Sequence, residues 1–246
     1  MKRRNFVGGL AAAFTAGCTR IGDSAWFGQV VDAAEGLHRR GHRALGGGRN
    51  ALAPEYSRAD ISPFFRGNGN TDVDTPAYRE AERSGFADWR VMVDGLVQNP
   101  LSLSLDEIRA LPQRTQITRH DCVEGWSAIG QWTGPQLSGI LDAASLRPEA
   151  RYIVFRCADN FSGADYYESC DLADAYHPQT IIAHQLNGEP LPVRNGAPLR
   201  MRLERHLGYK HAKYLTGIEA VASLDGIHGG GGGYWEDRGY QWYAGI

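Results

Sequence analysis

Cysteine is scarce in this sequence, and the paired spacings that mark cysteine-based redox or metal motifs are absent. The 246 residues contain four cysteines, Cys18, Cys122, Cys157 and Cys170, and no two of them form Cys-x-x-Cys or Cys-x-x-Cys-His. The chain therefore has no attachment site for a c-type haem of its own. Cys157 and Cys170 could pair in an oxidising compartment, but the sequence leaves that pairing open.

Strong charge and long apolar runs are also missing. The net charge is −2, which argues against a nucleic-acid partner held by phosphate electrostatics. Beyond the apolar residues 7–16 there is no second long apolar run, so we expect no membrane-spanning segment after the N-terminus. The glycine-rich residues 228–233 lack the Gly-Lys-Ser/Thr of a P-loop. We interpret them as a mobile link to an aromatic tail, residues 234–243, that packs on the domain.

The N-terminus has the pattern of an export signal. Arg3 and Arg4 precede an apolar run that is too short to span a bilayer, which is typical of a twin-arginine signal. Small residues lead to Cys18 as in a lipoprotein cleavage box, but a threonine replaces the usual leucine, so a lipid anchor on Cys18 stays open. A plain basic N-terminus is the alternative. We expect a signal over residues 1–18, a tether over 19–53, and a periplasmic protein exported by the twin-arginine route.

Alternating apolar and polar residues predict several short strands. We expect them near residues 89–93, 113–118, 152–157, 180–183, 199–203 and 214–221. Ser104 and Glu107 form a capping box that opens a helix ending before Pro112. A second helix should start with Pro135 at its first position and run to Ala144. Short strands interleaved with short helices favour an α+β fold with mixed sheets, in one domain over residues 54–246.

One stretch, residues 119–135, concentrates chemically distinctive side chains. Cys122 follows His120 and Asp121, and Trp126 and Trp132 come after it. A deprotonated cysteine is a soft metal ligand, and a neighbouring metal lowers its pKa enough to keep it deprotonated. From these residues alone, a buried and inert cysteine beside structural tryptophans is the simpler interpretation.

The same stretch resembles the molybdenum-ligating loop of the sulfite-oxidase-fold family, and especially its bacterial exported branch, which includes periplasmic methionine sulfoxide reductases. The resemblance extends over about residues 61–246. It implies the fold of the sulfite oxidase molybdopterin-binding domain and a molybdenum–molybdopterin cofactor. It also implies that the Cys122 thiolate is the protein's ligand to molybdenum, beside two sulfurs from the pterin dithiolene.

A segment before the domain's first predicted strand carries further resemblance. Phe65, Arg66 and Asn68 lie where the family folds against the pterin. Sulfite oxidases have an Arg-Asn-His triplet about here, whereas this chain has Gly67-Asn68-Gly69. The loss of the arginine and histidine argues against sulfite as the substrate. Taken alone, the segment is equally typical of a turn.

Two later segments resemble family motifs near the pterin or its phosphate. The resemblance assigns cofactor contacts to Asn195, Arg200, Gly208, Tyr209 and Lys210. A guanidinium can hold a phosphate bidentately, an ammonium adds a point charge, and glycine backbone can surround an anion. Without Cys122, a hairpin turn and a solvated basic edge would explain these residues as well.

Three residues near the predicted ligand have alternative roles. Cys157 stands where the resembled branch has a cofactor-contacting threonine, so a cofactor contact and a core position are both open. His120 and Asp121 are predicted to relay protons at the metal site, because histidine titrates near neutral pH. A hydrogen bond from His120 to the pterin or the backbone is the alternative.

These observations predict an oxidoreductase that transfers an oxygen atom or two electrons on a small, sulfoxide-like substrate. Because the chain has no haem or iron–sulfur motif, we expect a separate cytochrome or membrane haem protein as electron partner. We also expect a monomer, since the dimerisation domain of sulfite oxidases is absent. The alternatives are a cysteine hydrolase with Cys122 as nucleophile and His120 as base, and a non-catalytic anchored lipoprotein that binds a ligand.

Overall fold

The computed structural model describes residues 24–45 and 51–246. The predicted signal over residues 1–18, including Cys18, lies outside the described residues. The helices are α2 (Ala25–Leu45), α3 (Pro76–Arg83), α4 (Leu105–Ala110), α5 (Leu137–Ala144) and α6 (Leu172–Ala175), with 3-10 turns η1 (Arg58–Asp60), η2 (Val193–Asn195), η3 (Gly208–Lys210) and η4 (Glu236–Arg238). The strands are β1 (Arg90–Gly95), β2 (Leu101–Ser104), β3 (Gln113–Cys122), β4 (Trp126–Pro135), β5 (Tyr152–Phe161), β6 (Ala164–Asp171), β7 (Ile181–Ala183), β8 (Gln185–Leu186), β9 (Glu189–Pro190), β10 (Arg200–Arg202) and β11 (Leu215–Val221).

The predicted tether contains one long helix, α2, which forms a unit separate from residues 49–246. Within the two described ranges, no helix combines the length and apolar character needed to cross a bilayer.

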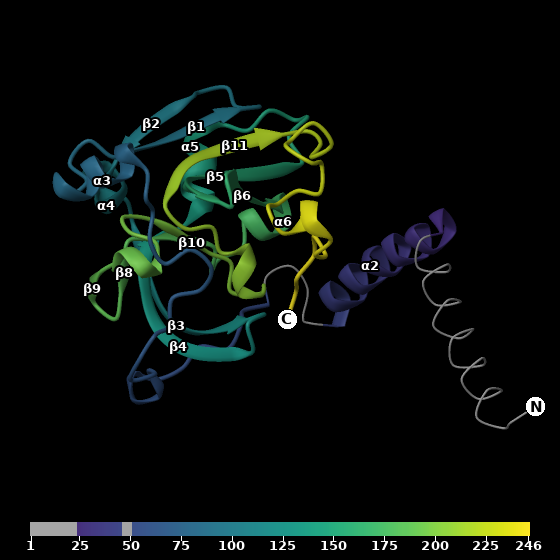
Figure 1. The fold of residues 1–246 in the computed structure, drawn as a ribbon, viewed down its shortest axis with the longest axis horizontal. Coiled ribbons are helices and arrows are strands. Elements are labelled where there is room, and N and C mark those ends of the chain that lie inside the picture. Colours follow the sequence, from purple (N-terminus) through teal and green to yellow (C-terminus); the bar gives the residue numbers. More distant parts are fainter. Residues whose placement is uncertain (1–23, 46–50) are drawn as a thin grey trace, which may run out of the picture. The chain divides into compact units, whose positions relative to one another are not determined.

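A five-stranded mixed sheet forms one layer of the domain (Figure 1). Its order is β2-β1-β11-β5-β6, with β1 and β11 parallel and the other pairs antiparallel. The capping box predicted at Ser104 is confirmed: the Ser104 hydroxyl accepts the N–H of Glu107 at 3.2 Å, and the Glu107 carboxylate accepts the N–H of Ser104 at 2.8 Å. The mixed sheet and the short helices confirm the predicted α+β fold with mixed sheets.

The long hairpin β3–β4 starts a second, four-stranded sheet with the order β3-β4-β8-β9. The two strands pair without interruption from Gln113–Pro135 to Cys122–Trp126. Pro135 is therefore the last residue of a strand, and the prediction that it opens a helix is wrong. Pairing with β3 keeps the chain extended through Pro135, and α5 begins only at Leu137.

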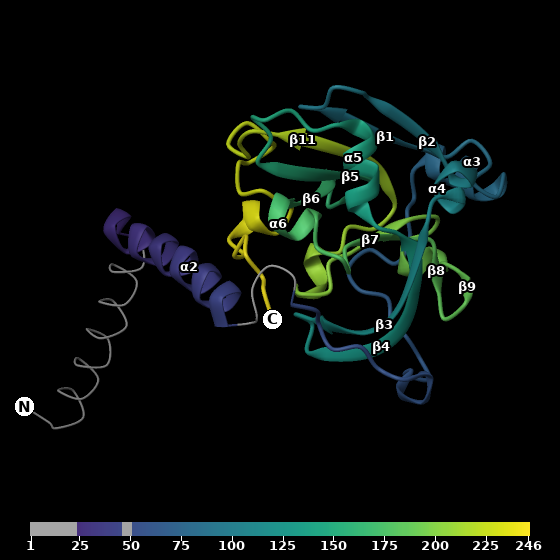
Figure 2. The ribbon, with the colours of Figure 1, turned by 180° about the vertical axis from the view of Figure 1, so that it is seen from behind.

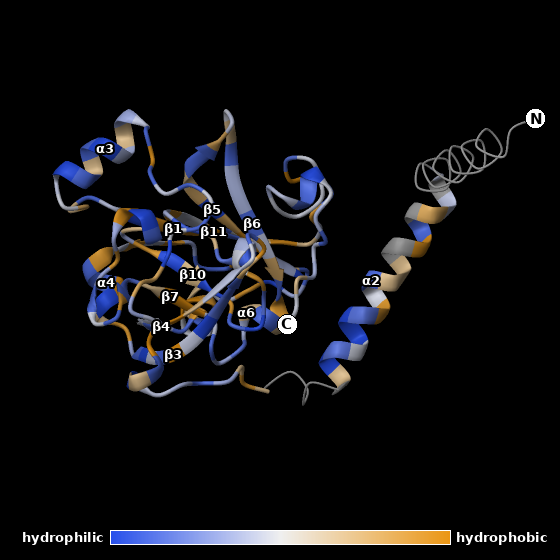
Figure 3. Ribbon diagram, turned by 60° about the horizontal axis from the view of Figure 1, so that its bottom comes forward, coloured by the Kyte–Doolittle hydropathy of each residue, from blue (hydrophilic) through white to orange (hydrophobic). Residues whose placement is uncertain are grey.

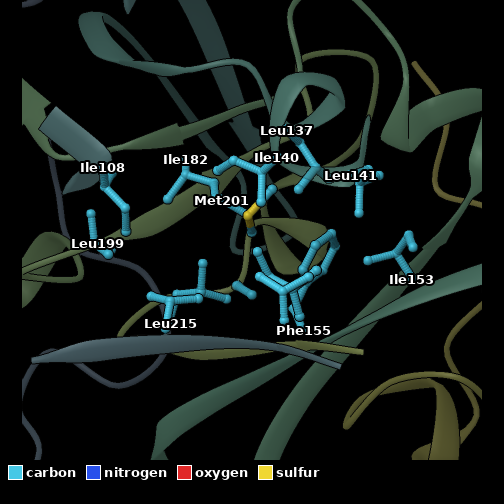
Figure 4. Packing of buried hydrophobic residues seen from close by; sticks show 14 of the residues in the cluster. Ile108, Leu137, Ile140, Leu141, Ile153, Phe155, Ile182, Leu199, Met201 and Leu215 are labelled. Carbon is cyan, nitrogen blue, oxygen red and sulfur yellow. The ribbon is translucent and has the colours of Figure 1, made fainter. Parts of the chain in front are cut away.

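The main core lies between the five-stranded sheet and the short helices. Figure 4 shows Ile108 of α4 and Leu137, Ile140 and Leu141 of α5 packed with Phe155 and Leu215 from the sheet. Full burial of each such side chain stabilises the fold by about 1.5–3 kcal/mol. Figure 2 places α4 and α5 on the side of the domain that is visible from behind, and Figure 3 shows the apolar segments gathered inside.

The aromatic tail packs on the domain, as predicted. Tyr234 is buried with Val154 and Tyr167, and the Tyr234 N–H donates to the Tyr167 carbonyl at 3.0 Å. The glycines before it are not a loose link. The N–H groups of Gly229 and Gly231 donate to the Asp237 carboxylate at 3.0 and 2.7 Å, so the glycine loop closes around that side chain.

Candidate active site

Cys122 ends β3 and turns its side chain inward. Only 9% of the residue is exposed. Burial raises the pKa of the Cys122 thiol, while a hydrogen bond from the Glu124 backbone and the charges of Arg200 and Lys213 oppose that rise. The thiol therefore keeps its proton until a metal ion binds the sulfur and displaces that proton.

A cavity of about 280 Å³ opens beside Cys122. Segments far apart in the sequence build its wall: the loop before α3, the β3–β4 turn, the β5–β6 hairpin, the segment around η3 and the tail. The lining residues are Asn68, Gly69, Asn70, Cys122, Val123, Glu124, Asp159, Phe161, Tyr166, Tyr209, His211, Lys213, Trp235 and Tyr240. The lining combines polar side chains, among them Asn68, Asp159 and Lys213, with five Phe, Tyr and Trp side chains.

Lys213 is the cation of this cavity, and the sequence analysis missed it. Its ammonium donates to the carbonyls of Asn68 at 2.6 Å, Asn70, and Arg194 at 3.4 Å. Burial, reinforced by the nearby charge of Arg200, lowers the pKa of Lys213 to about 7. The only signal in the sequence was a second lysine three residues after Lys210.

Asp159 faces the same cavity. One carboxylate oxygen accepts a hydrogen bond from the Asn70 amide at 2.8 Å, and the other, also buried, has no partner. Burial raises the pKa of Asp159. The cavity thus contains an acid and an amine whose pKa values are both displaced toward neutrality.

Behind the cavity lies a buried guanidinium without a counter-ion. Arg200 is fully buried, donates only to the carbonyls of Asn195 (2.9 Å) and His211 (3.4 Å), and keeps its Nε unpartnered. Among the residues the structure describes, no carboxylate forms an ion pair with it. Burial lowers the pKa of Arg200 to about 9. A buried charge left unpaired costs several kcal/mol, so this position favours an anionic ligand.

His120 is a second buried side chain with an unpartnered hydrogen-bond donor, its ring Nε2–H. Its Nδ1 lies 2.9 Å from an N–H of Arg202 and must accept, which places the proton on Nε2. Burial lowers the pKa of His120, so the ring is neutral at pH 7. The buried Nε2–H has no partner. A Cβ at Gly208 would lie 2.5 Å from Nε2, so only glycine leaves room for the ring.

These residues fit a large, anionic, hydrogen-bonding group. Buried polar atoms without partners are rare in proteins, yet Asn68, His120, Arg200 and His211 each have one here. Together with the uncompensated charge of Arg200, they would suit a pterin and its phosphate. A single thiol, Cys122, stands ready as the protein's ligand to a metal.

Comparison with known proteins decides the family. Residues 77–225 match the family described as the oxidoreductase molybdopterin binding domain. The chain belongs to this family. It is thus a molybdopterin-dependent oxidoreductase, as the resemblance implied.

Similar proteins add detail. A candidate protein-methionine-sulfoxide reductase subunit, YedZ1, from Azospira oryzae is 41% identical over 80% of this chain and 69% of its own length. The protein-methionine-sulfoxide reductase catalytic subunit MsrP of Xanthomonas axonopodis pv. citri is 34% identical over 63% of this chain and 51% of its own. The chain thus spans about half the length of MsrP.

The fold is also found in a solved structure. The sulfane dehydrogenase SoxCD from Paracoccus pantotrophus superposes with a TM-score of 0.52 at 21% identity. The match covers 56% of this chain and 39% of SoxCD. Because the two sequences are only 21% identical, the likeness supports a shared fold and nothing more.

Several predicted site residues of the oxidoreductase lie at or beside the cavity. Asn68, Cys122 and Tyr209 line it. Arg200 and His120 lie behind it, and the Asn195 carbonyl holds Arg200. Phe65 packs edge-to-face on Trp132 with ring centroids 5.0 Å apart, and it also contacts His120. Their contacts with the cofactor remain predictions.

Lys210 is placed differently from what the family motif suggested. It is buried, forms an ion pair with Glu168 at 2.8 Å and a second with Glu236, and does not line the cavity. Its charge is thus committed to two carboxylates, one of them from the tail. We correct the expectation that Lys210 supplies a free point charge, and the cavity's cation is Lys213.

Three other predicted residues also lie away from the cavity. Asp121 points to the opposite face of β3 from Cys122, as alternation requires, and forms an ion pair with Arg119 at 2.9 Å. Arg66 is exposed. Cys157 lies on β5 outside the cavity lining. Cys157 and Cys170 form no disulfide with each other.

The hydrolase alternative does not fit. His120 and Cys122 point to the same face of β3, but the Nδ1 of His120 is occupied by Arg202 and its Nε2 faces Gly208. A base must reach the proton of its nucleophile, and no hydrogen bond joins the two side chains.

Proposed function

We propose that this oxidoreductase reduces sulfoxides in the periplasm and receives its electrons from a separate haem protein. The similar proteins named as methionine sulfoxide reductase subunits support the substrate class. The absence of the arginine and histidine that flank the asparagine in sulfite oxidases supports it independently.

The observation that carries the proposal is the cavity beside Cys122, whose lining includes Asp159 and Lys213. Reduction of a sulfoxide to a sulfide consumes two electrons and two protons and releases the oxygen as water. The bound cofactor supplies the two-electron chemistry at its metal.

The protein's own side chains provide what the oxygen requires. Lys213 places a positive charge beside the substrate oxygen, while its own N–H groups are held by three backbone carbonyls. With its pKa lowered to about 7, Lys213 can donate a proton near neutral pH, and the raised pKa of Asp159 makes that carboxyl a second candidate proton donor.

Location and partner complete the proposal. The twin-arginine pattern at Arg3 and Arg4 supports export, and the small residues before Cys18 leave room for a lipid anchor. Since twin-arginine export accepts folded proteins, the cofactor can be inserted before the chain crosses the membrane. The names of the similar proteins describe subunits, which supports a further electron-carrying component.

The test is a panel of dye-linked assays on molybdenum-loaded protein. We expect reduction of methionine sulfoxide and dimethyl sulfoxide with a reduced viologen, and no oxidation of sulfite with ferricyanide. Loaded protein that oxidises sulfite and reduces no sulfoxide would disprove the proposed substrate class.

A further inference from the structure

Two of the five aromatic residues that line the cavity, Trp235 and Tyr240, come from the tail, which lies beyond the residues that match the family. The match ends at residue 225, whereas Trp235 and Tyr240 line the cavity together with Cys122. Trp235 is partly buried, and Tyr240 is 41% exposed. The tail therefore contributes lining residues that are open to solvent, as is Val123 in the β3–β4 turn, which lines the same cavity.

The two tail rings form a continuous apolar surface. Trp235 and Tyr240 have ring centroids 5.3 Å apart with 31° between their planes. Tyr240 also packs edge-on against Tyr209 at 5.3 Å, and Trp235 against Phe161 at 5.3 Å. The rings thus link the tail to the inner aromatic lining.

Buried charges fix this part of the tail in place. Glu236 follows Trp235 directly and pairs with Lys210, which also pairs with Glu168 of β6. Asp237 accepts hydrogen bonds from Gly229, Gly231 and the Tyr167 hydroxyl, the last at 2.7 Å. Through Lys210, these ion pairs connect the tail residue Glu236 to β6.

We propose that Trp235 and Tyr240 are specificity-determining residues that receive the organic substituents of the substrate, while the polar lining receives its oxygen. This inference rests on the proposed sulfoxide reductase function. Aromatic faces make favourable contacts with apolar groups and with sulfur. Larger aryl or alkyl sulfoxides therefore gain more from this rim than dimethyl sulfoxide does.

The test compares holoenzyme carrying Tyr240→Ala or Trp235→Ala with the wild type. For methyl p-tolyl sulfoxide we expect KM to rise about tenfold, since the contact of one aromatic ring corresponds to roughly a factor of ten. The KM for dimethyl sulfoxide and both kcat values should stay within about twofold. Tyr240→Phe should restore the wild-type KM.

A second measurement does not depend on turnover. Methyl p-tolyl sulfone keeps the substituents but resists this reduction, so its affinity for oxidised holoenzyme can be measured by calorimetry. We expect about tenfold weaker binding in both alanine variants. Tyr176→Ala is the matched control, because Tyr176 is 39% exposed and lies outside the cavity.

The outcomes separate the two claims. If the wild type reduces sulfoxides but Tyr240→Ala changes neither KM nor sulfone affinity beyond twofold, the rim does not select substrates and the inference is overturned. Because Tyr240 is exposed, this variant should fold even if Trp235→Ala does not. A wild type that reduces no sulfoxide overturns the proposed function, and the inference with it.

Discussion

At the scale of single residues, the site is defined by groups that lack partners. Within the part of the chain that the structure describes, Arg200 has no counter-ion, and buried atoms of Asn68, His120 and His211 have no hydrogen bond. Native proteins keep such atoms when a ligand satisfies them. The cofactor site is thus recognisable without reference to the metal.

Replacing Cys122 tests the ligand directly. We expect Cys122→Ser to lose molybdenum and turnover, because a serine hydroxyl is a poor replacement for a soft thiolate. The free energy of unfolding of the cofactor-free protein should change by less than about 1 kcal/mol. Molybdenum per protein is measured by mass spectrometry, and unfolding by urea titration.

A matched cysteine separates metal loss from general damage. Cys170 is also a buried cysteine outside any disulfide, but it belongs to the main core. Cys170→Ser should cost roughly 1–3 kcal/mol through burial of a hydroxyl, yet keep its molybdenum. Full molybdenum content in Cys122→Ser would rule out the assigned ligand.

Lys213 should give the cofactor-free protein a distinctive pH dependence. The folded protein releases the Lys213 proton near pH 7, whereas the unfolded chain holds it up to about 10.5. Between these values the unfolded state binds more protons, so the free energy of unfolding rises with pH, by at most about 1.4 kcal/mol per pH unit. Urea titrations from pH 6 to 10 measure this slope.

Lys213→Met should remove that rise, so the difference between wild type and variant grows with pH above 7. Parallel curves for the two proteins would show that Lys213 keeps an ordinary pKa when folded.

At the scale of elements, the site depends on how closely η3 approaches β3. A Cβ at Gly208 would lie 2.5 Å from the His120 ring, and that ring is buried. We expect Gly208→Ala to displace His120 and to weaken cofactor retention by about 10- to 100-fold, as lost supporting contacts do at metal sites. Molybdenum content after extended dialysis is the measurement.

Gly139 provides the control, because a Cβ there meets nothing within 4 Å. It lies inside α5, so Gly139→Ala should raise the free energy of unfolding by roughly 0.5–1 kcal/mol and leave molybdenum unchanged. Equal metal loss in both variants would mean that the Gly208 contact has no special role.

Sequence patterns predicted elements well where local rules decide, and less well where a distant partner decides. The Ser104 capping box is local, and α4 begins where expected. Pro135 suits the first turn of a helix, but its pairing with Gln113, 22 positions earlier, keeps it in a strand. Likewise, the motif located the segment around Lys210 correctly. It could not show that Lys210 forms ion pairs with Glu168 and Glu236, so that Lys213 is the lysine that lines the cavity.

At the scale of the whole molecule, the proposed export route predicts where the protein is found. Replacing both Arg3 and Arg4 with lysine should remove the twin-arginine signal and leave loaded enzyme in the cytoplasm. Cell fractionation with molybdenum analysis of each fraction measures this. Unchanged periplasmic enzyme would exclude the twin-arginine route.

The spread of the cavity along the chain has a consequence for biosynthesis. Its wall draws on positions from Asn68 to Tyr240, so a ribosome-bound chain that stops short of Tyr240 holds only a partial pocket. The residues that suit the cofactor run from Asn68 to His211, so delivery of the molybdenum group has to follow translation of that histidine, and an assembly factor would meet a nearly finished polypeptide.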